Sequence, residues 1–203
     1  MLEKLSKREK THQKMLEAAG RNFRRNGYAG IGVDGIAKAA GVTSGAFYAH
    51  FGSKDGAFTA ALEQGLDEVI EAIPVFQAEN GAGWVIAFAD YYLGQAHRED
   101  LECGCAMTSL SPEVARSEAG LRETYEEKMR IIADLIAGGL EGSVEDRAPD
   151  ERHGRAWAML ATLIGGLTIS RAVADPGLAT LIAQSVKRAA VDAAGQTIGV
   201  SDV

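Results

Sequence analysis

The chain has few residues that would cross-link it or hold it in a membrane. It contains only two cysteines, Cys103 and Cys105, and they are too close in sequence to make a useful structural disulfide, so we expect thiols. Only four prolines interrupt it. One of its longest apolar stretches, residues 156–169, is shorter than the about 18 residues that a membrane span needs and contains Gly165 and Gly166. A disulfide scaffold and a membrane-spanning protein are therefore not expected.

The first ten residues carry scattered charges and lack the apolar segment of a secretion signal. Apolar residues make up 46% of the chain and charged residues 24%, which is close to the average of globular proteins. This composition provides enough apolar surface for a sizeable core. We therefore expect a folded protein of the cytoplasm.

The sequence also lacks the common motifs of catalysis. It has no Gly-x-Ser-x-Gly elbow, no phosphate-binding glycine loop and no His-Glu-x-x-His pair. Cys103 and Cys105 could join His97 on a soft metal, but no fourth ligand is evident. The four histidines are scattered along the chain: His12, His50, His97 and His153. We therefore expect no enzyme, no metal site and no cofactor.

The net charge of −7 hides a strong asymmetry along the chain. Residues 1–54 hold ten lysines and arginines against four acidic residues, a net charge of +6, whereas residues 55–203 carry −13. A small basic part on a large acidic body is typical of a nucleic-acid reader joined to a part that must not bind nucleic acid. A solvated basic helix is the alternative. We place the domain boundary here, between a nucleic-acid-binding domain of residues 1–54 and an acidic domain of residues 55–203.

The sequence predicts an all-α fold, because alanine and leucine are abundant and no alternating strand pattern of useful length occurs. The helix after Ser53 should end at Pro74, and Ser111 with Pro112 should open a long helix. Residues 141–150 should form a loop and residues 195–203 should fray. The expected helices cover residues 6–26, 33–40, 43–50, 54–73, 84–97, 101–110, 111–140, 151–174 and 176–194.

Residues 31–54 have the spacing of a helix-turn-helix. Such a unit needs a small residue where its helices touch, a glycine in the turn, an apolar plug after it and apolar residues inside the second helix. Ala37, Gly41 and Val42 supply the first three of these features, and Phe47 with Phe51 supplies the last. The sequence therefore predicts a three-helix DNA-binding domain at the N-terminus.

The outer side of this second helix presents groups suited to a DNA groove. Ser44 would hydrogen-bond base edges, Ala46 would meet a thymine methyl group, and Gly45 would allow close approach. Tyr48, His50 and Lys54 are better suited to phosphates. Thr43 is an N-cap candidate, and His50 and Lys54 have a merely solvated role as their alternative. The candidate DNA-binding residues are Thr43, Ser44, Gly45, Ala46, Tyr48, His50 and Lys54.

These residues resemble the DNA-binding domain of the TetR/AcrR family of bacterial repressors over roughly residues 8–60. The matching register includes Ile36-Ala37, Ala40-Gly41-Val42, Phe47-Tyr48, His50-Phe51 and Ser53-Lys54. The resemblance implies a homodimeric repressor on a palindromic operator, released by a small apolar effector. It also implies that residues 1–54 are the DNA-binding domain and that residues 55–203 are the effector-binding and dimerisation domain. Its backbone contacts would fall on Tyr48, His50 and Lys54.

The sequence departs from the family pattern at two places. Gly32 stands where the family often has a capping Ser or Thr, and Asp55-Gly56-Ala57 replaces a more usual acidic-x-Leu. The second helix is therefore expected to be weakly capped and the fourth to start loosely. Asp34 is an acidic residue close to the expected DNA surface, and the sequence assigns it no role.

The last two helices are poor in charge over residues 156–173 and 178–183. The small residues Gly165, Gly166 and Ala172 would let helices approach closely. A four-helix bundle built by two protomers would bury this surface, whereas the alternative is that both helices cover the protomer's own core. We expect a homodimer through these helices.

Aromatic and sulfur-containing residues of the acidic part could frame an apolar ligand cavity, although such stripes usually pack as core. Residues 102–107 also look like the Gly-Cys segment of a TetR-family subgroup, in some of whose members the cysteine senses electrophiles or oxidants. A covalent trigger at Cys105 is therefore an alternative to a reversible effector, and a buried inert thiol is the simplest interpretation. The ligand-pocket candidates are Trp84, Phe88, Tyr91, Tyr92, Cys105, Met107, Met129 and Trp157.

Overall fold

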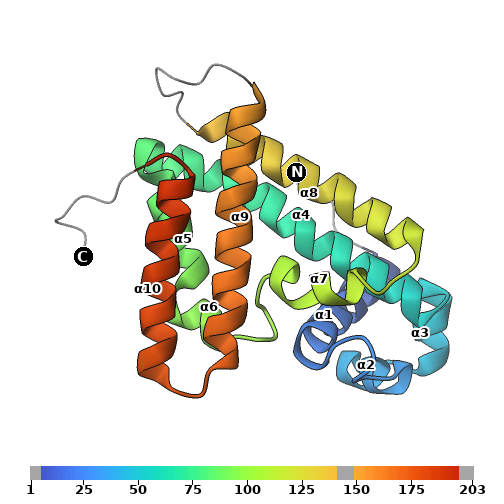
Figure 1. Cartoon of the computed structure of the whole chain (residues 1–203). Helices are drawn as coiled ribbons and strands as arrows, with labels where there is room; N and C mark the ends of the chain where they lie inside the picture. Colours follow the sequence, from blue (N-terminus) through green and yellow to red (C-terminus); the bar gives the residue numbers. More distant parts are fainter. Residues whose placement is uncertain (1–5, 141–148, 197–203) are drawn as a thin grey trace. The chain divides into compact units, whose positions relative to one another are not determined.

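A computed structural model describes residues 6–140 and 149–196, and every regular element in these ranges is helical (Figure 1). The predicted all-α class is confirmed. None of the described helices is long and apolar enough to cross a membrane. The elements are α1 (Lys7–Asn26), α2 (Val33–Ala40), α3 (Ser44–Phe51), α4 (Lys54–Asn80), the 3-10 turn η1 (Gly81–Gly83), α5 (Trp84–Leu93), α6 (Gln95–Glu99), α7 (Ala106–Val114), α8 (Ala119–Gly139), α9 (Pro149–Ala172) and α10 (Pro176–Ala193).

The chain divides into two compact units that are each built from separate segments. The first contains the residues up to Gly65 together with Leu101–Tyr125, and the second contains Leu66–Asp100 and the residues from Glu126 onward. Helices α4 and α8 each begin in the first unit and end in the second. These two units are defined by which residues pack together, and not by function. The functional boundary after Lys54 stays a prediction.

Local signals set the ends of the first three helices where the sequence predicts them. Ser6 and Glu9 form a reciprocal capping box at the start of α1, and Gly27, at φ 71°, ends this helix. Gly41 takes the left-handed conformation after α2, where its amide donates to the carbonyls of Ala37 and Lys38. Gly32 gives α2 no side-chain cap, so the expected weak capping is confirmed.

The core of the first unit is aromatic and aliphatic. Phe23, Ile36 and Phe47 are fully buried, which joins α1, α2 and α3 around one apolar centre. The ring of Phe58, near the start of α4, meets Phe23 edge to face at 5.1 Å between centroids. Ser53 accepts the amide of Gly56 at 2.9 Å, so a side-chain cap opens α4.

The predicted end of the fourth helix at Pro74 is wrong, because α4 continues to Asn80. Proline inside a helix removes a hydrogen bond and costs about 3 kcal/mol. Contacts beyond the proline offset this cost: the Phe76 ring meets Phe88 at 5.3 Å, and the Gln77 amide donates to a carbonyl of α8 at 2.8 Å. Tertiary contacts within the second unit therefore extend the helix past its local stop signal.

The single helix predicted over residues 84–97 is also wrong. It is divided into α5 and α6 at Gly94, whose backbone is extended and whose amide donates to the carbonyl of Tyr91 at 3.3 Å. A Cβ atom at this position would lie 2.8 Å from the carbonyl oxygen of Asp90, so only glycine fits here without movement.

The helix start predicted at Ser111-Pro112 is a third correction, since α7 runs through Pro112 to Val114 and α8 begins only at Ala119. Met107 and Leu110 are fully buried and Val114 is almost so, which places an apolar stripe on both sides of the proline. Burial of this stripe keeps the last turn helical although Pro112 donates no hydrogen bond.

Helices α9 and α10 lie side by side and antiparallel in the second unit (Figure 1). Leu163, Leu167 and Val191 are fully buried. The axes of α9 and α10 approach closely at Gly166, where a Cβ atom would lie 2.3 Å from Cγ1 of Val186. The predicted ends of both helices are confirmed within two residues. The expected loop and the expected frayed end, apart from residues 149–150 and 195–196, lie outside the described residues.

We expect Gly166→Ala to destabilise the fold by about 1–3 kcal/mol, because the new methyl group meets a stiff β-branched side chain. Gly154→Ala on the same helix is the control: nothing lies within 4 Å of a Cβ there, so it should add about 0.5–1 kcal/mol through helix propensity. Urea unfolding followed by circular dichroism measures both. Equal stability of the two variants would contradict the close approach.

Candidate nucleic-acid interface

Helix α3 presents a polar outer side over an apolar base. Phe47 is fully buried, whereas Tyr48 is 52% exposed, and the Phe47 ring lies 5.1 Å from that of Phe51 between centroids. Thr43 and Gly45 are exposed, and Ser44, Ala46 and His50 are partly so. The structure therefore leaves the predicted residues of α3 at least partly accessible, whereas Phe47 is buried.

Thr43 has a structural role that the sequence predicts. Its hydroxyl oxygen accepts the amide of Ala46 at 3.2 Å, and its backbone is extended as expected for an N-cap. The amides of Ser44 and Gly45 at the start of α3, where the helix dipole is positive, have no carbonyl partner within the helix. This end of the helix is suited to an anionic partner.

Ser44 has a partner that the sequence does not reveal. Its hydroxyl donates to the carboxylate of Asp34, at the start of α2, over 2.5 Å. Because the single hydroxyl proton is used in this bond, Ser44 offers acceptor lone pairs to any further partner. Asp34 thereby gains a role, which is to orient Ser44. The two residues are ten positions apart in different helices, so no local pattern indicates the pair.

His50 lies against another histidine. Its Nδ1 atom is 3.3 Å from Nδ1 of His12, on α1, and the His12 ring also lies 4.9 Å from that of Phe51. Burial lowers the pKa of His50, and electrostatic repulsion from His12 and Arg8 lowers it further. His50 is therefore neutral at pH 7 and is a hydrogen-bonding group there, not a cation.

Lys54 is held over an aromatic ring. Its ammonium lies 4.2 Å from the centroid of Tyr28, and the Tyr28 hydroxyl donates to Asp55 over 2.5 Å. The hydrogen bond to Asp55 raises the pKa of Tyr28 to about 12, with smaller contributions from burial and from the charge of Asp55. The side chain of Lys54 is thus positioned by Tyr28 at the first residue of α4.

Two arginines at the end of α1 are engaged within the first unit. Arg24 donates through Nε to the carbonyl of Glu102 at 2.9 Å, and Arg25 forms an ion pair with the Glu102 carboxylate. Residues 101–105 therefore neutralise part of the basic excess that composition assigns to residues 1–54. Sequence reasoning missed this contact because the partners lie almost eighty positions apart.

The predicted ligand-pocket residues are distributed over both units. Trp84, Phe88, Tyr92 and Met129 are buried in the second unit, where the Trp84 indole donates to the carbonyl of Gly139 at 2.8 Å. Tyr91 is 59% exposed and Trp157 is 41% exposed. Cys105 and Met107 are buried in the first unit, at the start of α7. Their role in ligand binding stays a prediction.

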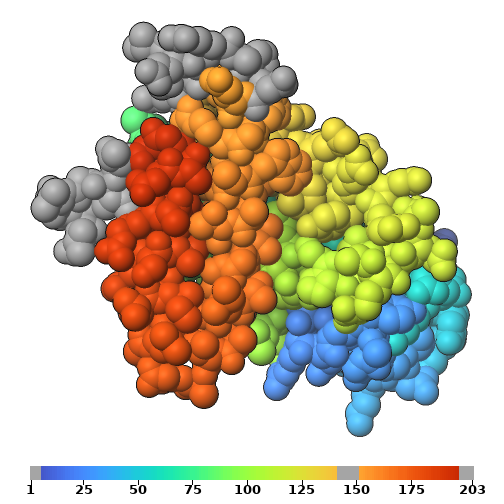
Figure 2. Space-filling view, viewed as in Figure 1, coloured from blue at the N-terminus to red at the C-terminus, as the bar shows by residue number. Residues whose placement is uncertain are grey.

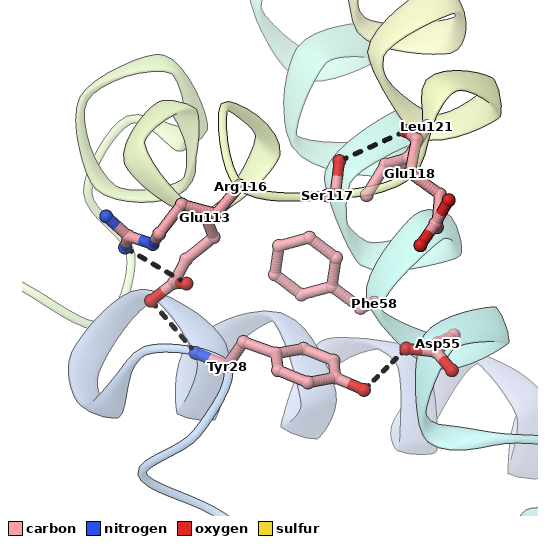
Figure 3. Close-up of a pocket in the computed structure, with 8 residues that line it drawn as sticks. All are labelled: Tyr28, Asp55, Phe58, Glu113, Arg116, Ser117, Glu118 and Leu121. Atoms are coloured by element: carbon pink, nitrogen blue, oxygen red, sulfur yellow. Dashed lines mark hydrogen bonds and ion pairs between the residues drawn. The ribbon is translucent and has the colours of Figure 1, made fainter.

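The first unit contains a pocket of about 300 Å³ that none of these candidates lines (Figure 3). Its walls come from three separate segments, which are the turn after α1, the start of α4 and the connection from α7 to α8. Sequence reasoning missed it because no single segment carries its pattern. The lining residues are Tyr28, Asp55, Phe58, Glu113, Arg116, Ser117, Glu118 and Leu121.

The two cysteines differ in access. Cys103 is exposed, whereas Cys105 is buried and occupies the N-cap position of α7. Across the described ranges, no group of three or more histidine, cysteine or acidic residues is arranged to hold a metal ion.

Comparison with known proteins gives the same picture for the N-terminal region. Residues 15–61 match the family model described as bacterial regulatory proteins, tetR family. The HTH-type transcriptional repressor SCO4008 of Streptomyces coelicolor is 28% identical over 141 residues, which cover 70% of this chain and 71% of that protein.

Solved structures share the fold over nearly the whole chain. A TetR-family transcriptional regulator from Cytophaga hutchinsonii has a TM-score of 0.78 at 20% identity, covering 97% of this chain and all of that one. The reduced form of NemR from Escherichia coli has a TM-score of 0.71 at 20% identity, covering 89% of this chain and 97% of that one. The architecture is an N-terminal helix-turn-helix followed by a larger helical part.

Proposed function

Because the chain belongs to the TetR family of bacterial regulatory proteins, we propose that it is a homodimeric repressor that leaves a palindromic operator when a small apolar effector binds. The observation that carries the proposal is α3, in which Phe47 is buried while the next residue, Tyr48, is half exposed. The family and the fold favour a DNA-binding regulator over an enzyme. A protein with this role works in the cytoplasm, where the DNA is.

In the proposed complex, α3 enters the major groove and its flanks bind the backbone. Tyr48 supplies an exposed hydroxyl and Lys54 a positive charge, while Thr43 and neutral His50 supply hydrogen-bonding groups for phosphates. Ser44, Gly45 and Ala46 face the bases. Because Asp34 takes the Ser44 proton, Ser44 would accept from the amino group of adenine or cytosine at a base edge.

The outer faces of α9 and α10 support a dimer. Three large apolar side chains are exposed there: Ile169 is 55% exposed, Leu178 45% and Leu181 57%. The two faces form one continuous surface (Figure 2). The small residue Gly165 on α9 has nothing within 4 Å of a Cβ position, so a partner helix has room to approach.

A symmetric pair of these helices would make a four-helix bundle and place two copies of α3 in the same dimer. Reading heads must stand roughly 34 to 36 Å apart to enter successive major grooves. An effector that favours another orientation of α4 would change this separation and lower the affinity for DNA. Trp84, Phe88, Tyr92 and Met129 remain our candidates for contacts to such an effector in the second unit.

We expect Tyr48→Ala to abolish operator retardation and Lys54→Ala to weaken DNA binding about equally on all sequences. Lys54→Ala should also reduce the slope of log affinity against log salt by about 1, because one phosphate contact is lost. Electrophoretic retardation of a duplex selected by the wild-type chain from a random pool measures both effects.

Arg130→Ala is the matched control, since Arg130 is an exposed arginine of the acidic body, paired with Glu126 at 2.6 Å. It should leave retardation unchanged. Light scattering checks that every variant remains a dimer. Wild-type retardation by both Tyr48→Ala and Lys54→Ala would refute the assignment of α3 and its flank.

The dimer itself is tested by Leu181→Glu. This substitution places two like charges in the proposed bundle, so the variant should be monomeric at micromolar concentrations while its helical content is kept. Val75→Glu is the control, because Val75 is similarly exposed at 51% but lies on α4. A Leu181→Glu chain that still has the mass of a dimer would exclude this face as the interface.

A covalent trigger at Cys105 is the alternative to a reversible effector. We expect Cys105→Ser to respond to an apolar effector as the wild-type chain does, because Cys105 is only 8% exposed and three acidic residues precede it closely in sequence. DNA release by a panel of apolar compounds and by hydrogen peroxide is compared in Cys105→Ser and Cys103→Ser. If DNA release is lost in Cys105→Ser and kept in Cys103→Ser, the covalent trigger is favoured.

A further inference from the structure

The pocket of the first unit has an acidic rim. Asp55, Glu113 and Glu118 contribute three carboxylates to its lining, and Arg116 contributes one positive charge. Arg116 is already paired with Glu113 at 3.2 Å. Figure 3 shows Glu113 on one side of the Phe58 ring and the carboxylates of Asp55 and Glu118 on the other. The second side is therefore negative without a lining cation to balance it.

The carboxylates on this side differ in their present partners. Asp55 accepts the hydroxyl of Tyr28. The carboxylate of Glu118 makes no hydrogen bond or ion pair with another residue in the described part of the chain. The hydroxyl of the neighbouring Ser117 donates to the backbone carbonyls of Val114 and Glu118, and not to this carboxylate. Glu118 is thus an available negative group at the mouth of the pocket.

The floor of the pocket is aromatic. Phe58 is 3% exposed, and its ring meets the ring of Tyr28 edge to face at 5.3 Å between centroids. Leu121 adds an aliphatic wall. Aromatic faces combined with carboxylates favour an ammonium group carried on an apolar substituent, since the charge meets the rim and the substituent meets the rings. The volume of about 300 Å³ suits a small molecule.

We propose that this pocket binds a small organic cation, an ammonium group on an aromatic or short aliphatic body, through Glu118 and Asp55. The site is distinct from the apolar cavity expected in the second unit, because every residue that lines it belongs to the first unit. The chain would thus have two ligand sites, one for an apolar effector in the second unit and one for an organic cation in the first.

Occupation of the pocket would act on DNA binding through Tyr28. The Tyr28 ring supports the ammonium of Lys54, and its hydroxyl is bound to Asp55, the next residue along the chain. A ligand cation that takes Asp55 competes with the Tyr28 hydroxyl and brings a like charge toward Lys54. This coupling rests on the proposed function, in which Lys54 binds a phosphate, whereas the pocket itself does not.

The binding test uses the full chain and phenethylammonium as the probe, followed by isothermal titration calorimetry and by amide shifts of residues 117–121. We expect binding by the ammonium compound and at least ten-fold weaker binding by neutral phenethyl alcohol. Glu118→Gln should weaken phenethylammonium binding at least ten-fold. The control Glu123→Gln removes an exposed charge from α8, which begins directly after Glu118, and should change nothing.

Absence of phenethylammonium binding, equal binding of the alcohol, or an unchanged affinity in Glu118→Gln would overturn the site. The coupling is tested separately by DNA retardation with phenethylammonium against sodium chloride at equal ionic strength. The coupling is supported if phenethylammonium lowers the retardation by the wild-type chain and lowers that by Glu118→Gln less. Equal retardation by the wild-type chain in phenethylammonium and in sodium chloride overturns the coupling. If the chain binds no DNA while the calorimetric result stands, the proposed function fails and the cation site remains.

Discussion

The burial of Phe47 determines which side of α3 reaches solvent. An α-helix turns by about 100° per residue, so a side chain fixed in the core places the residue after it on another side of the helix. Phe47 is fully buried, and Tyr48, the next residue, is 52% exposed. The left-handed turn at Gly41 then sets where α3 begins relative to α2. The candidate DNA surface is thus a result of core packing within the first unit.

Tyr28 organises the side of the first unit that holds the pocket, as Phe47 organises α3. Its ring contacts Phe23 and Phe58 in the core, its face carries the Lys54 ammonium, and its hydroxyl is bound to Asp55. One side chain therefore joins the aromatic core, a candidate phosphate contact and a pocket wall. Because an aromatic ring is rigid, a contact change that displaces the Tyr28 ring alters its contacts with all the other partners.

The sequence predicts those features whose cause is local. The end of the first helix at Asn26, the turn at Gly41 and the cap of Thr43 all depend on contacts within five residues, and each is confirmed. The errors at Pro74 and Pro112 have the opposite origin. A proline is a strong local stop signal, yet tertiary contacts of side chains beyond Pro74 and burial of side chains around Pro112 decide where these helices end. A single sequence contains no measure of those contacts or of that burial.

The same distinction applies to the candidate site. The sequence identifies the outward residues of α3 from helix periodicity and cannot identify their partners, because Asp34, His12 and Tyr28 reach Ser44, His50 and Lys54 only through the tertiary fold. The pocket is hidden from sequence for this reason as well, since three separate segments build it.

These partners alter the electrostatic argument that composition suggests. Residues 1–54 have a net charge of +6, but Arg25 is paired with Glu102 and Arg24 is bound to the carbonyl of that residue. His50 adds no charge at pH 7, because burial and its neighbours lower its pKa. The positive charge available to a phosphate backbone is therefore smaller than the composition indicates. In the proposed DNA complex, hydroxyl groups and the amides at the start of α3 would then supply a larger share of the binding, and these groups depend less on salt than lysine and arginine do.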